Sequence, residues 1–507
     1  MINLFRRKSP VSQSTGDRIP RRRHYQMAKL GGTTADWFSG DSTPDQLIFG
    51  ALRRSRNRAR DLARNDDYTR RFITLAKTNV VGPEGFVFRA RAYDWRNGRK
   101  ELDRPANGKI DDSFYSWAKP GHCTLDRVAS LTDVENQIVS GLIVDGEFLA
   151  RKVRGRFNDW GFALQAICPS RLDEQLNQQR CEAVAGVMDA QNEIRMGVEI
   201  DRYGAPVAYH FIRGESNVTS IGHTTHEGHD RIPADEIVHV FIQEVPGQTR
   251  GITLLAPVAY RKRMLDGFME SVTVGARVAA AKMGWLIRDP ENPADEPEQG
   301  PGAGMYDLSP GQIEEMPFGF NDFKPFDPGY PPANFEEFTK NILHGIAAGL
   351  GVSYLALSGD LKGVSYSGGR LAMLADQDAW RCMQRFVIEH FCEKFYPDWL
   401  QMALTTGAVD LPLAKIEKFL VHRWRGRGWR WADPKREVDA QIAAIKAGIK
   451  SFTEVCDEIG NDFEEVVEEL SENYALAEKM GITLLLDGPV SAFVDDDENT
   501  NPENEGE

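Results

Sequence analysis

Signatures of membrane insertion, disulfide stabilisation and common enzyme chemistry are missing from the 507 residues of this chain. No uncharged apolar run reaches the roughly 18 residues of a membrane-spanning helix, so none is expected. The N-terminus, MINLFRRKSP, is basic but has no apolar stretch after it, and we do not expect a secretory signal. The six cysteines form no C-x-x-C pair, which argues against a zinc ribbon or a disulfide scaffold and favours a reducing compartment.

Catalytic and metal-binding motifs are missing as well. The sequence contains no P-loop, no G-x-S-x-G nucleophile elbow and no acid spacing specific to a two-metal nuclease. His223, His226 and His229 lie in the polar segment GHTTHEGHD, but no apolar residues shape a metal site there and no H-E-x-x-H pattern is present. We therefore expect a protein that is not an enzyme and that uses no cofactor or metal.

The charge balance restricts how the protein can meet nucleic acid. The formal net charge is −14, which disfavours a sequence-specific DNA-binding protein with a broad basic face. It does not exclude a channel through which DNA slides, because a wall rich in Lys and Arg would grip the phosphates. Positive charge is concentrated in a basic arm at residues 1–40 and in the segment RRSRNRARDLARNDDYTRRF, residues 53–72.

The arginine-rich segment belongs to a helical stretch that is expected from residue 43 to about residue 80, either continuous or with one break, with Pro44 at its first position. Its arginines permit two interpretations, contacts with nucleic acid or ion pairs with acids of a neighbouring subunit. The arginines are Arg53, Arg54, Arg56, Arg58, Arg60, Arg64, Arg70 and Arg71.

Short helices and strands are mixed from residue 85 to residue 213, which indicates one compact α+β domain. The expected helices are 111–117 and 131–144. The expected strands are 147–153, 162–168, 194–200, 206–213 and 238–241, with a hairpin turn at 201–204.

A long helix, on the order of 45 Å, is expected at 254–283. Its small residues Gly275, Ala276 and Ala279 permit close packing with another helix. An irregular insertion at 288–333 follows, rich in proline, glycine, acids and aromatics. Insertions of that length usually have a function, so we expect a binding surface there.

The segment 334–397 organises the rest of the chain. Asn334 and Glu337 form an N-x-x-E capping box that predicts the start of a helix. The glycines and serines at 358–369 predict a mobile loop. A second, long helix follows, and we expect it to end at Pro397.

Trp424, Trp429 and Trp431 alternate with arginines after this helix. Such a pattern is typical of a surface on which single-stranded nucleic acid stacks, but we favour tryptophans that anchor a strand in the core. Asp433 and Pro434 predict the start of three terminal helices, which precede an acidic tail.

Five stretches resemble, in order and spacing, the lambda-type portal proteins of tailed phages, over roughly residues 40–480. They are RARDLARNDDY, IRMGVEIDRYGAPVAYHF, PGQTRGITLL, IAAGLGVSYLALS with VSYSGGR, and WADPKREVDAQIAAIKAGIKSFTEV. The resemblance implies a portal-type α+β subunit in a twelve-subunit ring at one capsid vertex, with DNA passing through its centre during packaging and ejection. It also favours the ion-pair interpretation of the arginines.

The resemblance implies a division of the chain into the parts of a portal subunit. These are the basic arm 1–40, the wing 41–253, the stem helix 254–287, the clip 288–333, the second stem helix 334–357, the tunnel loop 358–369, the long wing helix and return strands 370–434, the helical crown 435–480 and the acidic tail 481–507.

The family also implies partners and contact residues. Expected partners are further copies of the chain, the terminase large subunit, a head-completion or adaptor protein, the major capsid and scaffold proteins, and double-stranded DNA bound non-specifically, without a membrane. Assembly is expected in the host cytoplasm and residence in the virion. The tunnel loop would contact DNA through Lys362, Tyr366 and Arg370; the clip would dock partners through Glu314, Glu315, Phe318, Phe320 and Phe323; Gly275, Ala276 and Ala279 would pack subunits.

Two alternatives stay open at this point. One is a DNA-binding or DNA-processing protein that uses the arginine-rich helix 53–71, which the net charge and the missing motifs oppose. The other is a capsid or scaffold component without a channel.

Overall fold

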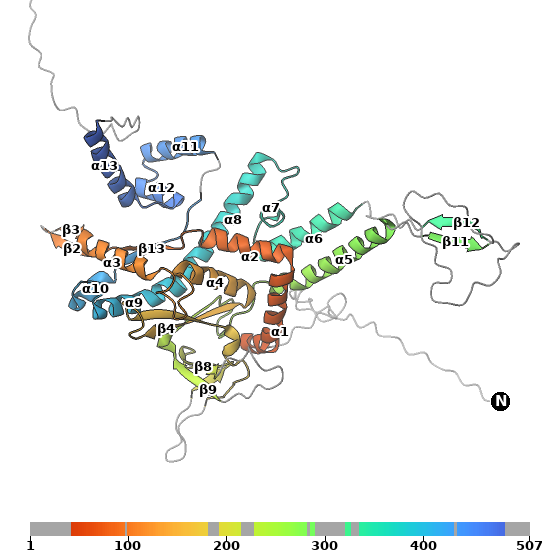
Figure 1. The fold of residues 1–507 in the computed structure, drawn as a ribbon, viewed down its shortest axis with the longest axis horizontal. Coiled ribbons are helices and arrows are strands. Elements are labelled where there is room, and N and C mark those ends of the chain that lie inside the picture. Colours follow the sequence, from red (N-terminus) through yellow and green to blue (C-terminus); the bar gives the residue numbers. More distant parts are fainter. Residues whose placement is uncertain are drawn as a thin grey trace, which may run out of the picture.

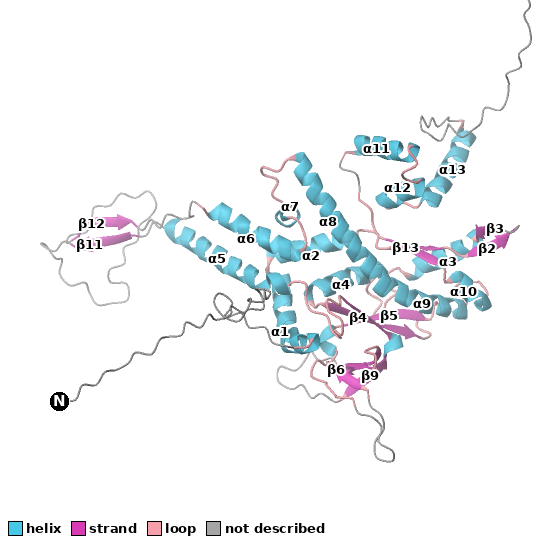
Figure 2. Ribbon diagram, turned by 180° about the vertical axis from the view of Figure 1, so that it is seen from behind, coloured by secondary structure: helices cyan, strands magenta, loops and turns pink. Residues whose placement is uncertain are grey.

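The computed structural model describes residues 42–96, 99–180, 192–213, 228–280, 284–288, 320–325, 334–429 and 433–481. The basic arm and most of the irregular insertion and acidic tail lie outside these ranges. Figures 1 and 2 show a central body from which a pair of helices extends on one side, while three terminal helices gather on the other.

Thirteen helices occur in the described part of the chain. They are α1 (Pro44–Asn65), α2 (Asp67–Val80), α3 (Arg104–Trp117), α4 (Leu131–Val144), α5 (Ala256–Ala280), α6 (Phe335–Leu350), α7 (Tyr354–Ser358), α8 (Tyr366–Val387), α9 (Glu393–Thr406), α10 (Ile416–Phe419), α11 (Pro434–Lys446), α12 (Phe452–Ile459) and α13 (Phe463–Met480). A π turn at Ile388–Cys392 joins α8 directly to α9.

The strands form small antiparallel sheets, ordered β10-β4-β5, β6-β7-β8-β9, β1-β13, β2-β3 and β11-β12. They are β1 (Val87–Ala90), β2 (Tyr93–Arg96), β3 (Arg99–Leu102), β4 (Glu147–Arg154), β5 (Phe162–Ile167), β6 (Glu193–Arg195), β7 (Val198–Ile200), β8 (Pro206–Ile212), β9 (His229–Pro233), β10 (Ile237–Phe241), β11 (Gly284–Arg288), β12 (Phe320–Pro325) and β13 (His422–Arg425). The predicted α+β class is confirmed.

Side-chain caps set the helix starts that the sequence predicts. Thr43 accepts a hydrogen bond from the Gln46 N–H, and the Gln46 side chain accepts one from the Thr43 N–H, which completes a capping box before Pro44. Asp66 ends α1 and caps α2 by accepting from the Thr69 N–H at 2.7 Å. Of the two forms expected for the helical stretch from residue 43 to about residue 80, the structure has the broken one, and the break lies at Asp66.

The predictions for Asn334 and for residues 194–200 are wrong. Asn334 precedes α6 but makes no capping hydrogen bond, because its φ of −97° and ψ of 15° are not the extended conformation that lets a side chain reach the first turn. The strand expected at 194–200 is split into β6 and β7, since Met196 and Gly197, with φ of 48° and 82°, make a tight turn between them.

The prediction that the long helix ends at Pro397 is also wrong, because Pro397 lies inside α9. A proline there removes one backbone hydrogen bond, at a cost of about 3 kcal/mol. Its neighbours Phe395, Tyr396 and Trp399 are fully buried, and burying such a side chain contributes about 2–3 kcal/mol each. The helix continues because this burial outweighs the lost bond.

Aromatic rings at the centre of the body join the early elements β1 and α3 to the late elements α9 and β13. Phe88 of β1 lies 4.3 Å from Phe114 of α3, 4.8 Å from Tyr396 of α9 and 5.0 Å from Trp424 of β13, measured between ring centroids. Trp424 is thus a core anchor, as favoured from the sequence. The Trp429 Nε1–H donates to Asn79 at 3.0 Å, and Trp431 lies outside the described residues.

Glu135 is an acid buried in this core. Its side chain is 1% exposed, and its carboxylate oxygen accepts a hydrogen bond from the Phe86 N–H at 3.1 Å. Burial raises the pKa of Glu135 to about 8, whereas the ordinary value is 4.5. Between these values the folded protein holds a proton that the unfolded chain has lost, so this group makes stability fall as the pH rises towards 8.

We expect Glu135→Gln to remove that fall, because an amide keeps the acceptor for the Phe86 N–H and cannot ionise. Relative to wild type, the variant should gain about 1 kcal/mol in unfolding free energy per pH unit above 4.5 and level off near pH 8. Denaturant unfolding across this range measures the difference. Glu84→Gln, at an exposed acid of the preceding turn, is the control. A constant difference between Glu135→Gln and wild type over the range contradicts the raised pKa.

Candidate functional site

Helices α5 and α6 run antiparallel and project from the body as a pair, with the β11–β12 hairpin at the far end (Figure 1). Phe268 of α5 lies 5.9 Å from Phe335 and 5.0 Å from Phe338 of α6. Gly349 leaves room for Val258, because a Cβ at that position would overlap the valine side chain. With 25 residues, α5 is about 37 Å long, so the pair forms an extended arm.

One face of α5 is uncovered. Tyr260, Met264 and Val274 are 79%, 59% and 50% exposed, and a Cβ at Gly267 would meet nothing within 4 Å. Their spacing of three and four residues, continued by Ser271, places them in one stripe along the helix. This stripe is the side of the arm that is open to another molecule.

The small residues predicted to pack subunits lie elsewhere on α5. Gly275 and Ala276 are partly buried and follow Val272, which is 8% exposed, by three and four residues. They continue the side of α5 that is covered within the chain. The side chain of Ala279 lies outside the described ones.

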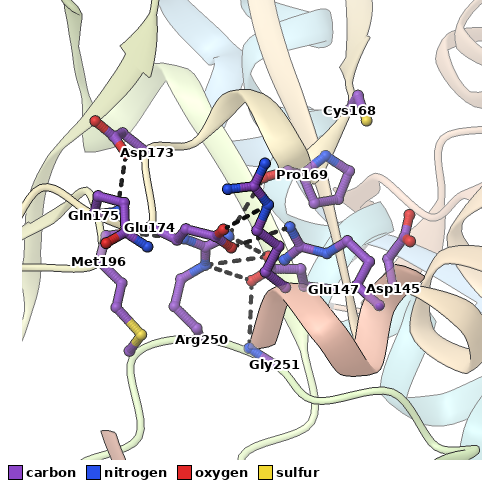
Figure 3. Close-up of polar contacts among 12 residues, drawn as sticks. Asp145, Glu147, Cys168, Pro169, Asp173, Glu174, Gln175, Met196, Arg250 and Gly251 are labelled. Carbon is purple, nitrogen blue, oxygen red and sulfur yellow. Dashed lines mark hydrogen bonds and ion pairs between the residues drawn. The ribbon is translucent and has the colours of Figure 1, made fainter. Parts of the chain in front are cut away.

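A buried cluster of charges fixes the base of α5 (Figure 3). Arg250, in the turn before α5, is fully buried and donates to the Glu147 carboxylate at 2.5 and 2.8 Å. Arg56 of α1 donates to the same carboxylate at 2.9 Å, His239 of β10 lies 3.1 Å from it, and the Gly251 N–H donates at 3.3 Å. Glu147, at the start of β4, thereby links α1, the central sheet and the arm.

Glu147 remains ionised in this cluster. Burial alone would raise the pKa of its carboxyl, but the charge and hydrogen bonds of Arg250, with the contact to His239, hold that pKa well below its ordinary value. Burial lowers the pKa of His239, which keeps the imidazole neutral near pH 7. One ionised carboxylate therefore forms ion pairs with two buried guanidinium groups, those of Arg250 and Arg56.

Several arginines of α1 have partners within their own chain. Besides Arg56, Arg60 donates to Asp145 at 2.7 and 3.1 Å, and Arg53 lies 3.8 Å from Glu174. Pairing with a neighbouring subunit, as favoured from the sequence, is wrong for Arg56 and Arg60, because their acids belong to the same chain: Glu147 begins β4 and Asp145 ends α4. Arg54 and Arg58 are exposed.

The second feature of the site is the connection from α6 to α8. Asp376 of α8 accepts hydrogen bonds from the Ser353 N–H at 2.7 Å and from its hydroxyl at 2.6 Å, which ties α8 to the start of α7. Gly359, with a φ of 71°, ends α7. The loop that follows, 359–365, is the connecting loop.

The connecting loop is shorter than the predicted loop 358–369. Ser365 caps α8 by accepting a hydrogen bond from the Gly368 N–H at 3.2 Å, so Gly368 and Gly369 belong to the first turn of a helix. The cap overrides the low helix propensity of the two glycines.

The three residues predicted to contact DNA differ in their surroundings. Lys362 has a side chain that is 75% exposed and lies 3.3 Å from Glu336 of α6. Tyr366 is 62% exposed. Arg370 instead donates to Glu437 of α11 at 2.7 Å. The structure brings Lys362 and Tyr366 to the surface of the connecting loop and directs Arg370 to the terminal helices.

Helices α11–α13, here called the terminal cluster, contact the body through ion pairs and through the backbone of Gly428, where an added Cβ would overlap the backbone of Ile459 and Gly460. Ala477 is the one buried apolar residue among residues 433–481. In the six pairs that follow, every acid belongs to the cluster and every arginine to the body. They are Arg370–Glu437 (2.7 Å), Arg423–Asp457 (2.6 Å), Arg91–Asp462 (3.0 Å), Arg425–Asp462 (3.6 Å), Arg91–Glu464 (3.4 Å) and Arg104–Glu468 (3.1 Å).

Of the residues predicted for docking on the clip, only two lie in the part of the chain that the structure describes. Phe320 and Phe323 lie on β12, whereas Glu314, Glu315 and Phe318 lie outside the described residues.

Of the three histidines, His223 and His226 also lie outside, and His229 is 2.7 Å from Asp173. In the ranges that the structure describes, no group of three or more His, Cys, Asp or Glu residues is arranged to hold a metal. No helix in those ranges is long and apolar enough to cross a membrane.

Known proteins similar to this chain point to one family. The model of the lambda family of phage portal proteins matches residues 30–384. A probable portal protein of Halomonas phage phiHAP-1 is 29% identical over 481 residues, 94% of this chain and 90% of that protein. Portal protein B of Escherichia phage lambda is 24% identical over 86% of each chain.

Among solved structures, a chain from the neck of the native gene transfer agent particle, computed with C12 symmetry, has 14% identity and a TM-score of 0.41, covering 80% of this chain and 93% of that one. The family match alone spans well over half of the sequence, and both phage relatives align over most of their length. The protein therefore belongs to the lambda family of phage portal proteins.

Proposed function

We propose that copies of this chain form a ring at a capsid vertex, through whose channel DNA is packaged and later ejected. Portal proteins are structural rather than enzymatic. The observation that carries the proposal is the projecting arm with an uncovered apolar stripe, Tyr260, Met264, Gly267 and Val274. In a ring each arm stands beside the next, which gives this stripe a partner.

In this proposal the arm is the stem of the ring, and the body is its wing. The terminal cluster is the crown, and the insertion at 288–333, which carries β12, is the clip. The connecting loop is the tunnel loop. The expected number of copies is twelve, as the resemblance of the sequence implies.

The tunnel loop contacts DNA through Lys362, whose side chain is 75% exposed. One lysine per copy, repeated around a ring, makes many weak contacts with phosphates, which suits a polymer that must slide. Tyr366, adjacent to the loop, adds a large polar ring. Arg370 is engaged by Glu437 and makes no such contact while that pair is intact.

The clip is the docking surface for the terminase large subunit and then for a head-completion or adaptor protein, because its described strand β12 lies at the far end of the arm (Figure 1). Glu314, Glu315, Phe318, Phe320 and Phe323 supply the acids and aromatics of that surface. The major capsid and scaffold proteins would surround the wing, after assembly in the host cytoplasm. A DNA-processing function gains no support, since Arg56 and Arg60 are engaged inside the chain.

The stripe on α5 gives a direct test of ring formation. Met264→Glu should leave the single chain folded, because this side chain is 59% exposed, but should shift rings to smaller species, because it places a carboxylate against the apolar surface of the next copy. Sedimentation velocity and negative-stain electron microscopy at micromolar concentration measure this.

The control is Tyr203→Glu at the tip of the β7–β8 hairpin, an apolar residue that is 77% exposed and lies away from the arm. Wild-type protein that stays monomeric counts against the ring. Rings of unchanged abundance in Met264→Glu count against the stripe as the contact between copies.

A further inference from the structure

We propose that docking of the terminal cluster sets the length of the tunnel loop, through the ion pair between Arg370 and Glu437. This rests on the proposed function, which makes the loop 359–365 the segment that meets DNA. The pair joins the second turn of α8 to α11, with an N–O distance of 2.7 Å and side chains that are 37% and 19% exposed.

The beginning of α8 has little else to hold it. None of the side chains from residue 366 to residue 375 is buried, and Figure 1 shows this end of α8 standing away from the body. Within that stretch, Arg370 makes the one side-chain hydrogen bond to another element, and the next tether along the helix is Asp376, which binds Ser353.

The first turn is also a weak helix by composition. Gly368 and Gly369 lie in it, and glycine is the least favourable helix residue apart from proline. The Ser365 cap, with its hydrogen bond of 3.2 Å from the Gly368 N–H, favours the turn. The cap and the Arg370–Glu437 pair favour the helical form of this turn, and the two glycines disfavour it. The free-energy difference between the helical and the unwound form is therefore small.

Release of the cluster therefore lengthens the loop. Without the Arg370–Glu437 pair the first turn frays, and the loop grows from 359–365 to 359–369. The four residues that are added extend its reach by about 13 Å. Because six ion pairs join the cluster's acids to the body's arginines, salt weakens the docking.

Amide hydrogen exchange of the full-length assembled protein, without DNA, tests this. Glu437→Gln should speed exchange at residues 369–372 roughly two- to fivefold, the range expected for loss of a partly exposed pair. Arg370→Gln should do the same. Asp439→Asn, an exposed acid on the same helix that forms no ion pair within the described residues, is the matched control.

A second variant should stabilise the helical form of the first turn of α8. An added Cβ at Gly369 would lie 3.5 Å from Val364 and 3.8 Å from Leu355, which are ordinary contacts. Gly369→Ala should therefore slow exchange of the same amides up to roughly fivefold, and in combination with Glu437→Gln should return it towards the wild-type rate.

Raising NaCl from 0.1 M to 1 M, which shortens the Debye length from about 10 Å to about 3 Å, should speed exchange in wild type but add little in Glu437→Gln. If Glu437→Gln exchanges like Asp439→Asn, or if exchange rises equally beyond Asp376, the coupling is refuted. The exchange experiment contains no DNA, so a negative result refutes the coupling without testing the channel function. The channel function is tested separately, by DNA binding.

Discussion

Replacing Glu147 with glutamine should lower the unfolding free energy of the body by about 3–5 kcal/mol. Glutamine keeps the size of the side chain but removes the charge that Arg250 and Arg56 share, and both guanidinium groups are almost completely buried. Breaking a buried ion pair from one side costs about 3–5 kcal/mol. That is a large part of the roughly 5–15 kcal/mol that stabilises an ordinary domain.

Denaturant unfolding at pH 7 measures this loss. Glu174→Gln is the control, since Glu174 lies 3.8 Å from Arg53 and 3.9 Å from Arg56, at the limit of an ion pair, and should cost less than about 1 kcal/mol. The pKa of Glu147 is held below its ordinary 4.5, so its contribution is complete above that pH and is lost only as the pH falls through the depressed value. Equal stability of Glu147→Gln and wild type at pH 7 would show that the cluster does not hold the arm.

Reversing the charge of the tunnel loop with Lys362→Glu should abolish packaging or retention of full-length DNA while rings still assemble. The side chain is 75% exposed and its neighbour Glu336 is 60% exposed, so the fold loses little. In a ring, however, the side chain at position 362 of every copy would repel the DNA phosphates and no longer attract them, and this effect is repeated around the channel.

Complementation of a phage that lacks its own portal gene gives the biological measurement. Binding of purified rings to short duplex DNA gives the physical one, because each lost phosphate contact lowers the slope of log K against log salt by about one unit. Lys119→Glu, at an exposed lysine of the body, carries the same change of charge away from the loop. Normal packaging by Lys362→Glu rings would mean that another segment grips the DNA.

Local sequence signals predicted the parts of the fold that local physics decides. The helix expected at 131–144 has those bounds, and Thr43 and Asp433 cap the helices that were expected to start beside them. The failure at Asn334 shows the limit of this approach, since a capping side chain works only when its own backbone is extended.

Contacts between distant segments could not be predicted in this way. Glu147 and Arg250 lie about a hundred residues apart, and no periodicity reports which arginine meets which acid. The one available signal was a charge at the start of β4, where the burial of Phe148, Leu149 and Ala150 makes an exposed acid improbable. The contact of Arg370 with Glu437 is another example, because no pattern near residue 370 reveals its partner.

The pairing of β1 with β13 has a consequence for how the chain is made. Phe88 packs on Trp424 and Tyr396, which are translated more than three hundred residues later. During synthesis the early half of the body therefore cannot complete its core until these residues have left the ribosome. The arm is translated inside this interval, before the body can close. A nascent chain thus has its arm but no finished body to orient it, so assembly into the proposed ring should be restricted to chains whose translation has passed β13.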